Sequence, residues 1–564
     1  NDYMNIKGII MSVSRRNLLR NAGIFGASAA VTGPTMAMSS KPAVDPLAEK
    51  VIVDFGHGVA SGDPLSDRVI LWTRISPQIN AATEVTWRIC DDVEMQQEVN
   101  SGTLTTDSSR DFTVKVDADG LLPNTWYYYQ FSSGDKSSVI GRTKTAAESG
   151  LDRLRLAVVS CSSFPHGYFN VYRILSERND LDAIVHLGDY IYEYGVGEYG
   201  DKSLELQRDL LPKHEIVNLT DYRQRHNLYK RDLDLQAVHQ QYPFIVTWDD
   251  HEFANDTWKD GAGNHNDSEG DFLVRKTKAK QAYFEWMPIR NQPEDLGSCY
   301  RKLPFGNLVD LIMLDTRVEG RDEQPSGLYA QQIRHDENRT LMGFEQEAWL
   351  HNQLKSSTAK WKVLGQQVQI QQLGPVALPD RLGGGISFFL DTWDGYTATR
   401  KRLFNFIDDN NIDNMVVLTG DIHSTWVADL AHDPFDKRYY NGETGEGSLA
   451  VEFVTPSVSS PALPPVIGDI AAAALKSSSP HLKHCDMVHN GFFILDVTEE
   501  RAQADWFFVK TVKEKSTEHN HGVSYKTNNK ANRLTKVVAP AIARPNSASF
   551  APAIEELTAE GASA

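Results

Sequence analysis

Cysteine is scarce in this sequence. The 564 residues include only Cys90, Cys161, Cys299 and Cys485, and their wide spacing excludes a disulfide framework and a CxxC zinc site. Cys161 follows a predicted strand and is considered below with the candidate site. The other three are interpreted as structural cysteines, and spacing alone leaves open whether two of them form a disulfide.

Positive charge is also in short supply. The chain has 57 Lys and Arg residues against 75 Asp and Glu, a formal net charge of −18. Such an acidic surface repels nucleic-acid backbones and anionic lipids over a long range, which argues against a nucleic-acid scaffold role. An anionic substrate would therefore have to be attracted locally, by a bound metal or by a few cationic side chains.

Long hydrophobic runs are missing as well. Beyond the N-terminal region no run reaches the ~18 apolar residues of a membrane helix, so no integral membrane segment is expected. Arg15 and Arg16 precede a mild Ala- and Gly-rich run over residues 22–37. This pattern resembles a twin-arginine export signal, which predicts a signal peptide over residues 1–40, the twin-arginine machinery as a partner, and a periplasmic or extracellular location. A chance arginine pair on another basic leader, or on a cytosolic tail, is the alternative.

The region after this signal is predicted to be a small β-sandwich. Residues 51–146 contain short alternating segments separated by turn residues, with no helical period, which is typical of such a domain. Residues 122–129 resemble a late strand of a fibronectin-type sandwich. The alternating segments are residues 69–73, 84–89, 112–116 and 122–129.

The larger part of the chain, residues 152–515, has a different pattern. An apolar strand over residues 155–159, a helix over 168–177 and a strand over 182–187 form a βαβ unit, which predicts an α/β core with a parallel sheet flanked by helices. A charged helix is expected over residues 220–240. Residues 539–564, rich in Ala, Pro and Ser, are predicted to be a disordered tail. Further strands are expected at residues 244–248, 308–314, 361–365, 415–418, 451–454 and 492–497.

Polar side chains follow four of the apolar strands directly. In an open α/β sheet the carboxyl ends of the strands share one edge, where ligands bind. Carboxylates gathered there repel one another unless cations neutralise them, so two metals sharing a bridging carboxylate would suit this edge and would activate a hydroxide for phosphoryl transfer. Asp189, which follows Gly188, is the predicted bridge. The four segments are Ser160-Cys161-Ser162, Gly188-Asp189-Tyr190-Ile191-Tyr192-Glu193, Asp249-Asp250-His251-Glu252 with Asn255, and Gly420-Asp421-Ile422-His423.

With these segments in order, together with residues 55–64, 72–74 and 314–317, the chain resembles the PhoD family of alkaline phosphatases and phosphodiesterases, within the calcineurin-like metallophosphoesterases. The resemblance extends from the export signal nearly to residue 512. It implies a β-sandwich before an α/β metallophosphoesterase core, and Fe³⁺ with Ca²⁺ where many relatives use Zn²⁺ or Mn²⁺. The residues agree with that metal choice, because a thiolate and a phenolate suit ferric iron, and oxygen donors suit calcium.

The resemblance also implies a role for each residue. Cys161, Asp189, Tyr192 and His423 would surround the iron, and Asp250, Asn255 and Asp421 would hold calcium beside the bridging Asp189. His251 stands where relatives keep a histidine beside the phosphate, so it is the candidate acid or transition-state stabiliser. The division of ligands between the two metals stays open.

Each of these residues has a simpler interpretation. Cys161 could be an inert buried thiol, and Tyr192 an aromatic at the edge of the site. Asp249 and Glu252 are expected to orient ligands rather than to bind a metal. Arg317 and Arg321 could bind phosphate or form structural ion pairs. His57 and His186 are interpreted as structural, whereas His166 and the pair Gln366-Gln367 are left open.

The sequence thus predicts a secreted, metal-dependent alkaline phosphatase that cleaves phosphate monoesters, and diesters as well, through a metal-activated hydroxide, to scavenge phosphate. A phospholipase D-like phosphodiesterase is the nearest alternative, and a metal- or phosphate-binding protein without turnover is another.

Overall fold

The fold is described from a computed structural model. It covers residues 55–554, apart from residues 79, 201, 202, 204, 207, 291–296 and 375–377. The predicted signal peptide, residues 1–40, and the last ten residues lie outside the described part of the chain.

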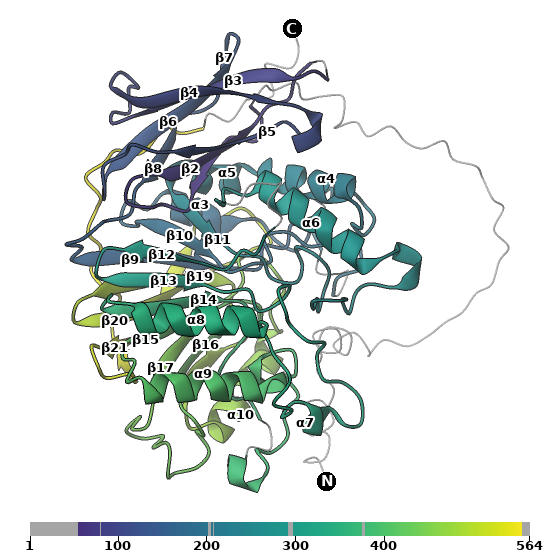
Figure 1. The fold of residues 1–564 in the computed structure, drawn as a ribbon, viewed down its shortest axis with the longest axis vertical. Coiled ribbons are helices and arrows are strands. Elements are labelled where there is room, and N and C mark those ends of the chain that lie inside the picture. The colour runs from purple at the N-terminus through teal and green to yellow at the C-terminus, as the bar shows by residue number, and fades with distance from the viewer. Residues whose placement is uncertain are drawn as a thin grey trace, which may run out of the picture.

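Two β-sheets packed face to face form the centre of the molecule (Figure 1). The larger has ten strands in the order β22-β21-β20-β19-β9-β10-β11-β1-β2-β5, and the second has seven in the order β12-β13-β14-β15-β17-β16-β18. The central strands are nearly continuous apolar runs that are buried on both faces, as β10, β11 and β15 illustrate. One face of each sheet packs against the other sheet, and the opposite face is covered by helices. Val158 of β9 and Leu418 of β15 belong to the same buried cluster between the two sheets.

The strands of the larger sheet are β1 (Val59–Gly62), β2 (Val69–Arg74), β5 (Thr113–Ala118), β9 (Arg153–Val159), β10 (Ala183–His186), β11 (Pro243–Val246), β19 (Gly491–Thr498), β20 (Arg501–Val509), β21 (His519–Asn528) and β22 (Leu534–Val537). Those of the second are β12 (Arg301–Phe305), β13 (Val309–Met313), β14 (Trp361–Gln366), β15 (Met415–Thr419), β16 (Thr425–Leu430), β17 (Ala450–Val454) and β18 (Leu482–Asp486).

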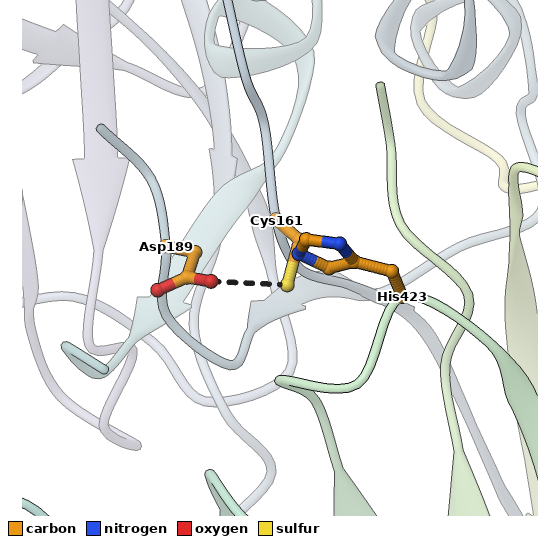
Figure 2. Close-up of side chains that lie close together, drawn as sticks. All are labelled: Cys161, Asp189 and His423. Carbon is orange, nitrogen blue, oxygen red and sulfur yellow. Dashed lines mark hydrogen bonds between the residues drawn. The ribbon is translucent and has the colours of Figure 1, made fainter. Parts of the chain in front are cut away.

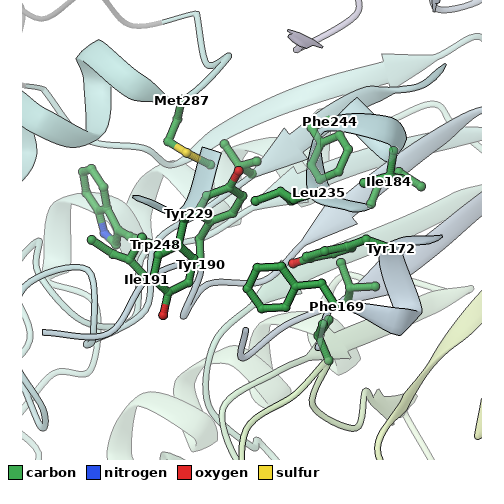
Figure 3. Packing of buried hydrophobic residues seen from close by; sticks show 14 of the residues in the cluster. Phe169, Tyr172, Ile184, Tyr190, Ile191, Tyr229, Leu235, Phe244, Trp248 and Met287 are labelled. Carbon is green, nitrogen blue, oxygen red and sulfur yellow. The ribbon is translucent and has the colours of Figure 1, made fainter. Parts of the chain in front are cut away.

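Helices cover the outer face of both sheets, which gives four layers in the order helix, sheet, sheet, helix. On the ten-stranded sheet lie α3 (Asn170–Ser176), α4 (Leu219–Lys230), α5 (Leu233–Gln241) and α6 (Phe272–Trp286). Aromatic side chains of these helices, such as Tyr172 and Tyr229, pack in this core beside Phe244 of the sheet, as Figure 3 shows. On the seven-stranded sheet lie α8 (Phe344–Ser356) and α9 (Thr397–Asp409), while α7 (Ala330–Ile333) and α10 (Pro465–Ser478) lie towards one end of the molecule. The α/β architecture predicted from the βαβ pattern is confirmed.

The helix expected over residues 220–240 is divided into α4 and α5. Asp232 causes the break, because its side chain accepts hydrogen bonds from the backbone N–H groups of Asp234 and Leu235 and so caps a new helix. Asn218 and Asp221 form a capping box at the start of α4. Local capping therefore overrides the continuous helical pattern.

The region of the predicted β-sandwich has two layers, one of which continues into the ten-stranded sheet. Its outer layer is a small sheet of β3 (Thr83–Cys90), β4 (Glu98–Thr106), β6 (Trp126–Ser133), β7 (Lys136–Ser137) and β8 (Gly141–Lys144). The facing layer, β1, β2 and β5, belongs to the ten-stranded sheet, because β1 pairs in parallel with β11. Alternation along a strand predicts its two faces but not its distant partner, so the sequence could not reveal this junction. The fibronectin-type comparison stays a prediction.

Residues 539–554, the described part of the predicted disordered tail, make specific contacts with the rest of the chain. Ala551 is buried, and its backbone N–H donates to Gln241 Oε1 at 3.0 Å. The carbonyl of Ser549 accepts hydrogen bonds from Tyr128 at 2.7 Å and from Arg142 at 3.2 Å. Polar composition suggested disorder, but extended chains of small residues can also pair through their backbone with a preformed surface.

All four cysteines lie within the described chain, are buried and form no disulfide. None of the described helices is long and apolar enough to cross a membrane.

Candidate metal centre

The candidate site forms where strands from both central sheets end. β9 leads to Cys161, β10 to Asp189 and β11 to Asp250, and these three strands are neighbours in parallel. β15 of the second sheet leads to Asp421 and His423. The Cys161 N–H donates to the carbonyl of Gly188 at 3.1 Å, and its Sγ lies 3.8 Å from the carbonyl oxygen of Asp421. The carboxyl ends of the strands therefore meet as the sequence predicted.

Four of the candidate ligands adopt left-handed backbone conformations. The φ angles are +61° at Cys161, +56° at Asp189, +70° at Asp421 and +56° at His423. Such angles are uncommon for residues other than glycine and cluster at functional sites. These angles turn the chain sharply just after each strand. A glycine would adopt such a turn more easily, but it would supply no side chain as a ligand.

A thiol, a carboxylate, a phenol and an imidazole converge at the centre. Figure 2 shows Cys161 and His423 directed towards Asp189. The Cys161 Sγ lies 3.3 Å from Asp189 Oδ2, and the Tyr192 hydroxyl lies 3.1 Å from that same oxygen and 3.1 Å from His423 Nε2. Ligand atoms of Cys161, Asp189 and His423 lie within 4.8 Å of one another, close enough to hold one metal ion. Ser460 Oγ donates to the Tyr192 oxygen at 2.7 Å.

Ionisation of this phenol is unfavourable in the protein alone. Burial, and then the negative charge of Asp189, raise the pKa of Tyr192 well above its usual value. A cation beside the oxygen would reverse both effects, because it favours the charged form. The donor set is thus consistent with a strongly Lewis-acidic metal.

A second group of donors is acidic. Oxygens of Asp249, Asp250 and Asp421 lie within 4.8 Å of one another, and all three side chains are buried. Asp249 Oδ2 has no hydrogen-bond partner, and burial, although opposed by the charge of Arg317, raises its pKa well above the usual value. A buried carboxylate oxygen without a partner is costly, and a hard cation would satisfy it. The structure therefore brings Asp249 among the candidate ligands, beyond the orienting role that the sequence suggested.

Arg317 lies among these carboxylates and is fully buried. Its guanidinium donates to Asp249 Oδ1 at 2.5 Å, to both oxygens of Asp391 at 2.9 and 2.7 Å, and to Asp421. Arg321 also donates to Asp391, at 2.5 Å. Between the two alternatives for these arginines, the structure favours ion pairing over phosphate binding. Asp391 itself was missed, because no strand or motif precedes it in the sequence.

Ligand atoms of His251 form a third group with Asp189 and Asp250. His251 Nδ1 lies 2.6 Å from Glu193 Oε2, and its ring packs against that of Tyr192 with centroids 4.3 Å apart. Burial lowers the pKa of His251, but the charges of Glu193, Asp250 and Asp189 outweigh burial and raise it to about 10. Glu193 was quoted in the sequence motif but given no role.

Asn255 lies in the loop that follows His251. Its side chain is buried, and its backbone N–H donates to Glu193 Oε1 at 2.7 Å. In the same loop the backbone N–H of Asp256 donates to Asp250 Oδ2 at 2.7 Å. These bonds fix the loop beside the acidic group.

The remaining candidates have structural contacts. Glu252 accepts from the backbone N–H groups of Asp189 at 3.1 Å, Tyr190 at 2.6 Å and Asp249 at 2.8 Å, so it orients the strand ends as expected. Gln367 donates to the Trp248 carbonyl at 2.7 Å and bonds Thr316. His57 and His186 are buried, and burial lowers the pKa of each to about 3.

Parallel strands that deliver a thiol, a phenol, imidazoles and carboxylates to one buried edge define an α/β phosphatase of the metal-binding type. A family model described as "PhoD-like phosphatase" matches residues 156–506, and the corresponding N-terminal domain model matches residues 40–147. The chain therefore belongs to the PhoD-like phosphatase family, as the motifs predicted.

Individual relatives agree with this assignment. Alkaline phosphatase D of Bacillus subtilis (strain 168) is 40% identical over 426 residues, which cover 72% of this chain and 69% of the relative. A solved structure described as "Structure of PhoD" superposes with a TM-score of 0.77 at 35% identity, over 87% of this chain and 93% of that one.

Proposed function

We propose that this protein is an exported, metal-dependent alkaline phosphatase that uses ferric iron and calcium. The observation that carries the proposal is the convergence of Cys161, Asp189, Tyr192 and His423 on one buried point. Thiolate and phenolate together favour a trivalent iron over zinc or manganese.

Calcium is proposed for the acidic group. Oxygen ligands at several positions in a flexible arrangement suit Ca²⁺, and Asp249, Asp250 and Asp421 offer carboxylates alone, without sulfur or imidazole. Asn255 would add an amide oxygen from the adjoining loop. Asp189 belongs to the group of Cys161 and His423 and also to a group with Asp250 and His251, and Asp250 is a member of the acidic group. This supports its proposed role as the bridge between the two metals.

When bound, the metals would neutralise the clustered carboxylates and withdraw negative charge from the phosphoryl oxygens. The residues of the chain would position the metal ligands and supply the proton. Asp189, Tyr192 and Cys161 hold their donor atoms in fixed positions through buried hydrogen bonds. His251, held on Glu193 and against Tyr192, would give a proton to the departing oxygen of the ester. Phosphate released in this way outside the cell would serve phosphate scavenging.

The twin-arginine signal supports export, since that pathway carries folded proteins and would allow the metals to be loaded first. This part of the proposal is tested by fractionating cells that express the full chain. Activity that stays in the cytoplasm of a strain with an intact twin-arginine pathway would contradict it.

The activity is tested with p-nitrophenyl phosphate and its bis ester at alkaline pH, with and without Ca²⁺. Cleavage of the monoester is expected, with slower cleavage of the diester. Preference for the diester would favour the phosphodiesterase alternative, and failure to cleave either compound would leave only the binding-protein alternative.

The iron assignment is tested by visible absorption spectroscopy. Ferric iron bound to tyrosinate and thiolate should give a charge-transfer band in the visible spectrum, which Cys161→Ser and Tyr192→Phe should each shift or weaken. Tyr194→Phe is a control, because Tyr194 is a neighbouring, half-buried phenol that packs beside His251. A colourless, iron-free protein with full activity would refute the iron assignment.

A further inference from the structure

Glu193 is a buried carboxylate at the centre of a hydrogen-bond network. One oxygen, Oε2, lies 2.6 Å from His251 Nδ1. The other, Oε1, accepts the backbone N–H of Asn255 at 2.7 Å and the side-chain amide of Asn264 at 2.9 Å. The side chain is fully buried, so these bonds are not exchanged with bulk water and should be strong.

The partners of Glu193 are themselves fixed. Asn264 also donates to Glu215 at 3.1 Å, and its backbone N–H donates to the Asn255 carbonyl at 3.0 Å. Glu215 in turn pairs with the buried Arg275 at 2.8 Å. The Glu193 carboxylate therefore has little freedom to turn, and neither has a ring that is bound to it.

The contact at Nδ1 determines the orientation of His251. A carboxylate only accepts hydrogen bonds, so His251 Nδ1 must carry the proton that it donates to Glu193. The two ring nitrogens point in diverging directions, so Nε2 is turned away from Glu193. The ring of Tyr192, with its centroid 4.3 Å away, and the ring of Tyr199, at 5.5 Å, restrict rotation of the imidazole.

From this geometry we propose that Glu193 is a positioning residue that acts through His251, directing Nε2 to the leaving oxygen of the ester. The proposal rests on the proposed phosphatase function. In the reaction, the oxygen of water forms a bond to phosphorus while the bond between phosphorus and the ester oxygen breaks. The leaving oxygen keeps the electron pair and takes a proton from Nε2. The proton released by the attacking water then restores the histidine.

A single amide substitution separates this role from simple packing. In Glu193→Gln the one remaining oxygen would stay with the donors of Asn255 and Asn264, so the new NH₂ group would face His251 Nδ1. Two donors cannot bond each other, so Nδ1 would become an acceptor and the ring would lose its carboxylate partner. Proton transfer to a poor leaving group should then fail, although the shape of the side chain is kept.

The experiment compares two substrates. A simple alkyl phosphate needs a proton on its leaving oxygen, whereas p-nitrophenolate leaves without one. We expect Glu193→Gln to lower kcat for the alkyl ester by about 10²–10⁴-fold, the usual contribution of a general acid, and kcat for p-nitrophenyl phosphate by less than about tenfold, with KM for both changed little. Iron and calcium contents, measured by elemental analysis, should equal those of the wild type.

The matched control is Glu215→Gln, which alters the same network but touches neither His251 nor Asn255 in the described contacts. It should lower both rates by the same small factor. In addition, Glu193→Gln should have no further effect on the alkyl ester once His251 has been replaced by Ala, because the two residues act as one unit. If Glu193→Gln fails to fold, kcat for the two substrates is compared in Glu193→Asp instead, because this variant keeps the charge and shortens the side chain.

Equal losses for both substrates, or additive losses in the double variant, would overturn the role of Glu193 while leaving the phosphatase assignment intact. Loss of metal from Glu193→Gln would overturn it too, since Glu193 would then serve only the loop of Asn255. If the wild-type protein cleaved neither substrate, the proposed function itself would fail.

Discussion

Arg317 offers a quantitative test of the acidic group. Its guanidinium contacts Asp249, Asp391 and Asp421, and lies 3.8 Å from Asp250. Arg317→Met removes one positive charge from among these carboxylates while keeping an unbranched apolar stem. Breaking a buried ion pair by removing one partner typically costs about 3–5 kcal/mol. Asp391, with 24% of its side chain exposed, can be partly rehydrated, so most of this cost falls on Asp249 and Asp421.

A cation at the acidic group should reduce this loss. With one positive charge gone, the remaining carboxylates attract calcium more strongly, and a tenfold tighter affinity is worth about 1.4 kcal/mol at saturating Ca²⁺. The assay is the Tm of the wild type and of Arg317→Met, each in excess Ca²⁺ and in EGTA. We expect the variant to be less stable in both, with the smaller deficit in Ca²⁺.

Arg275→Met is the control, because Arg275 is an equally buried arginine that pairs with Glu215 and Glu269. Arg275→Met should lower Tm by the same amount with and without Ca²⁺. If Ca²⁺ stabilised Arg317→Met no more than the wild type, or if Arg317→Met lost no stability, the acidic group would not be the calcium site argued here.

Three further predictions follow from the structure. Asp189→Ala should abolish activity outright rather than raise KM, and elemental analysis should show less of both metals, because Asp189 lies with Cys161 and His423 and also with Asp250 of the acidic group; retention of both metals would contradict the bridge. The pKa of the buried His226 is lowered to about 3 by burial, from 6.5 when unfolded, so its contribution to stability is present above pH 6.5 and declines as the pH falls towards 3. When the pH is lowered from 8 to 5, the free energy of unfolding of the wild type should therefore fall by about 2 kcal/mol more than that of His226→Phe, as measured by urea unfolding; equal falls in the two proteins would refute this. Removal of residues 539–564 should lower Tm but leave kcat/KM unchanged, since Ala551 and Ser549 bond to α5 and to the outer sheet; an unchanged Tm would show that these contacts contribute nothing.

The sequence was sufficient to predict which strand ends would meet. Cys161, Asp189, Asp250 and Asp421 each follow an apolar run that forms a buried strand, and a βαβ unit places such ends at one edge. That inference needs only local patterns and the handedness of the connections. It accounts for the ends of β9, β10 and β11, which share one sheet. Asp421 joins them for a reason the sequence did not supply, because β15 belongs to the second sheet and the two sheets pack together.

Long-range contacts could not be predicted in the same way. Asp391 follows no strand and is linked to the acidic group by Arg317, 74 residues earlier. The bond from Glu193 to His251 joins residues 58 positions apart, and the parallel pairing of β1 with β11 joins segments about 180 positions apart. Each of these depends on how the sheets pack, which no single segment of the sequence specifies.

The backbone at the site suggests why the metals and the fold depend on one another. Left-handed conformations at Cys161, Asp189, Asp421 and His423 cost on the order of 1–3 kcal/mol each, and a glycine at any of these positions would relieve that cost. The chain instead keeps side chains there, and all four residues are buried. Packing alone compensates neither the strain nor the burial, because a thiol, two carboxylates and an imidazole do not replace an apolar core. Metal ligation would provide the missing stabilisation, so a chelator should loosen these four turns before it affects the sheets, as hydrogen exchange with and without chelator would detect. Uniform loosening across β9, β10 and β15 would instead indicate that the turns are stable without ions.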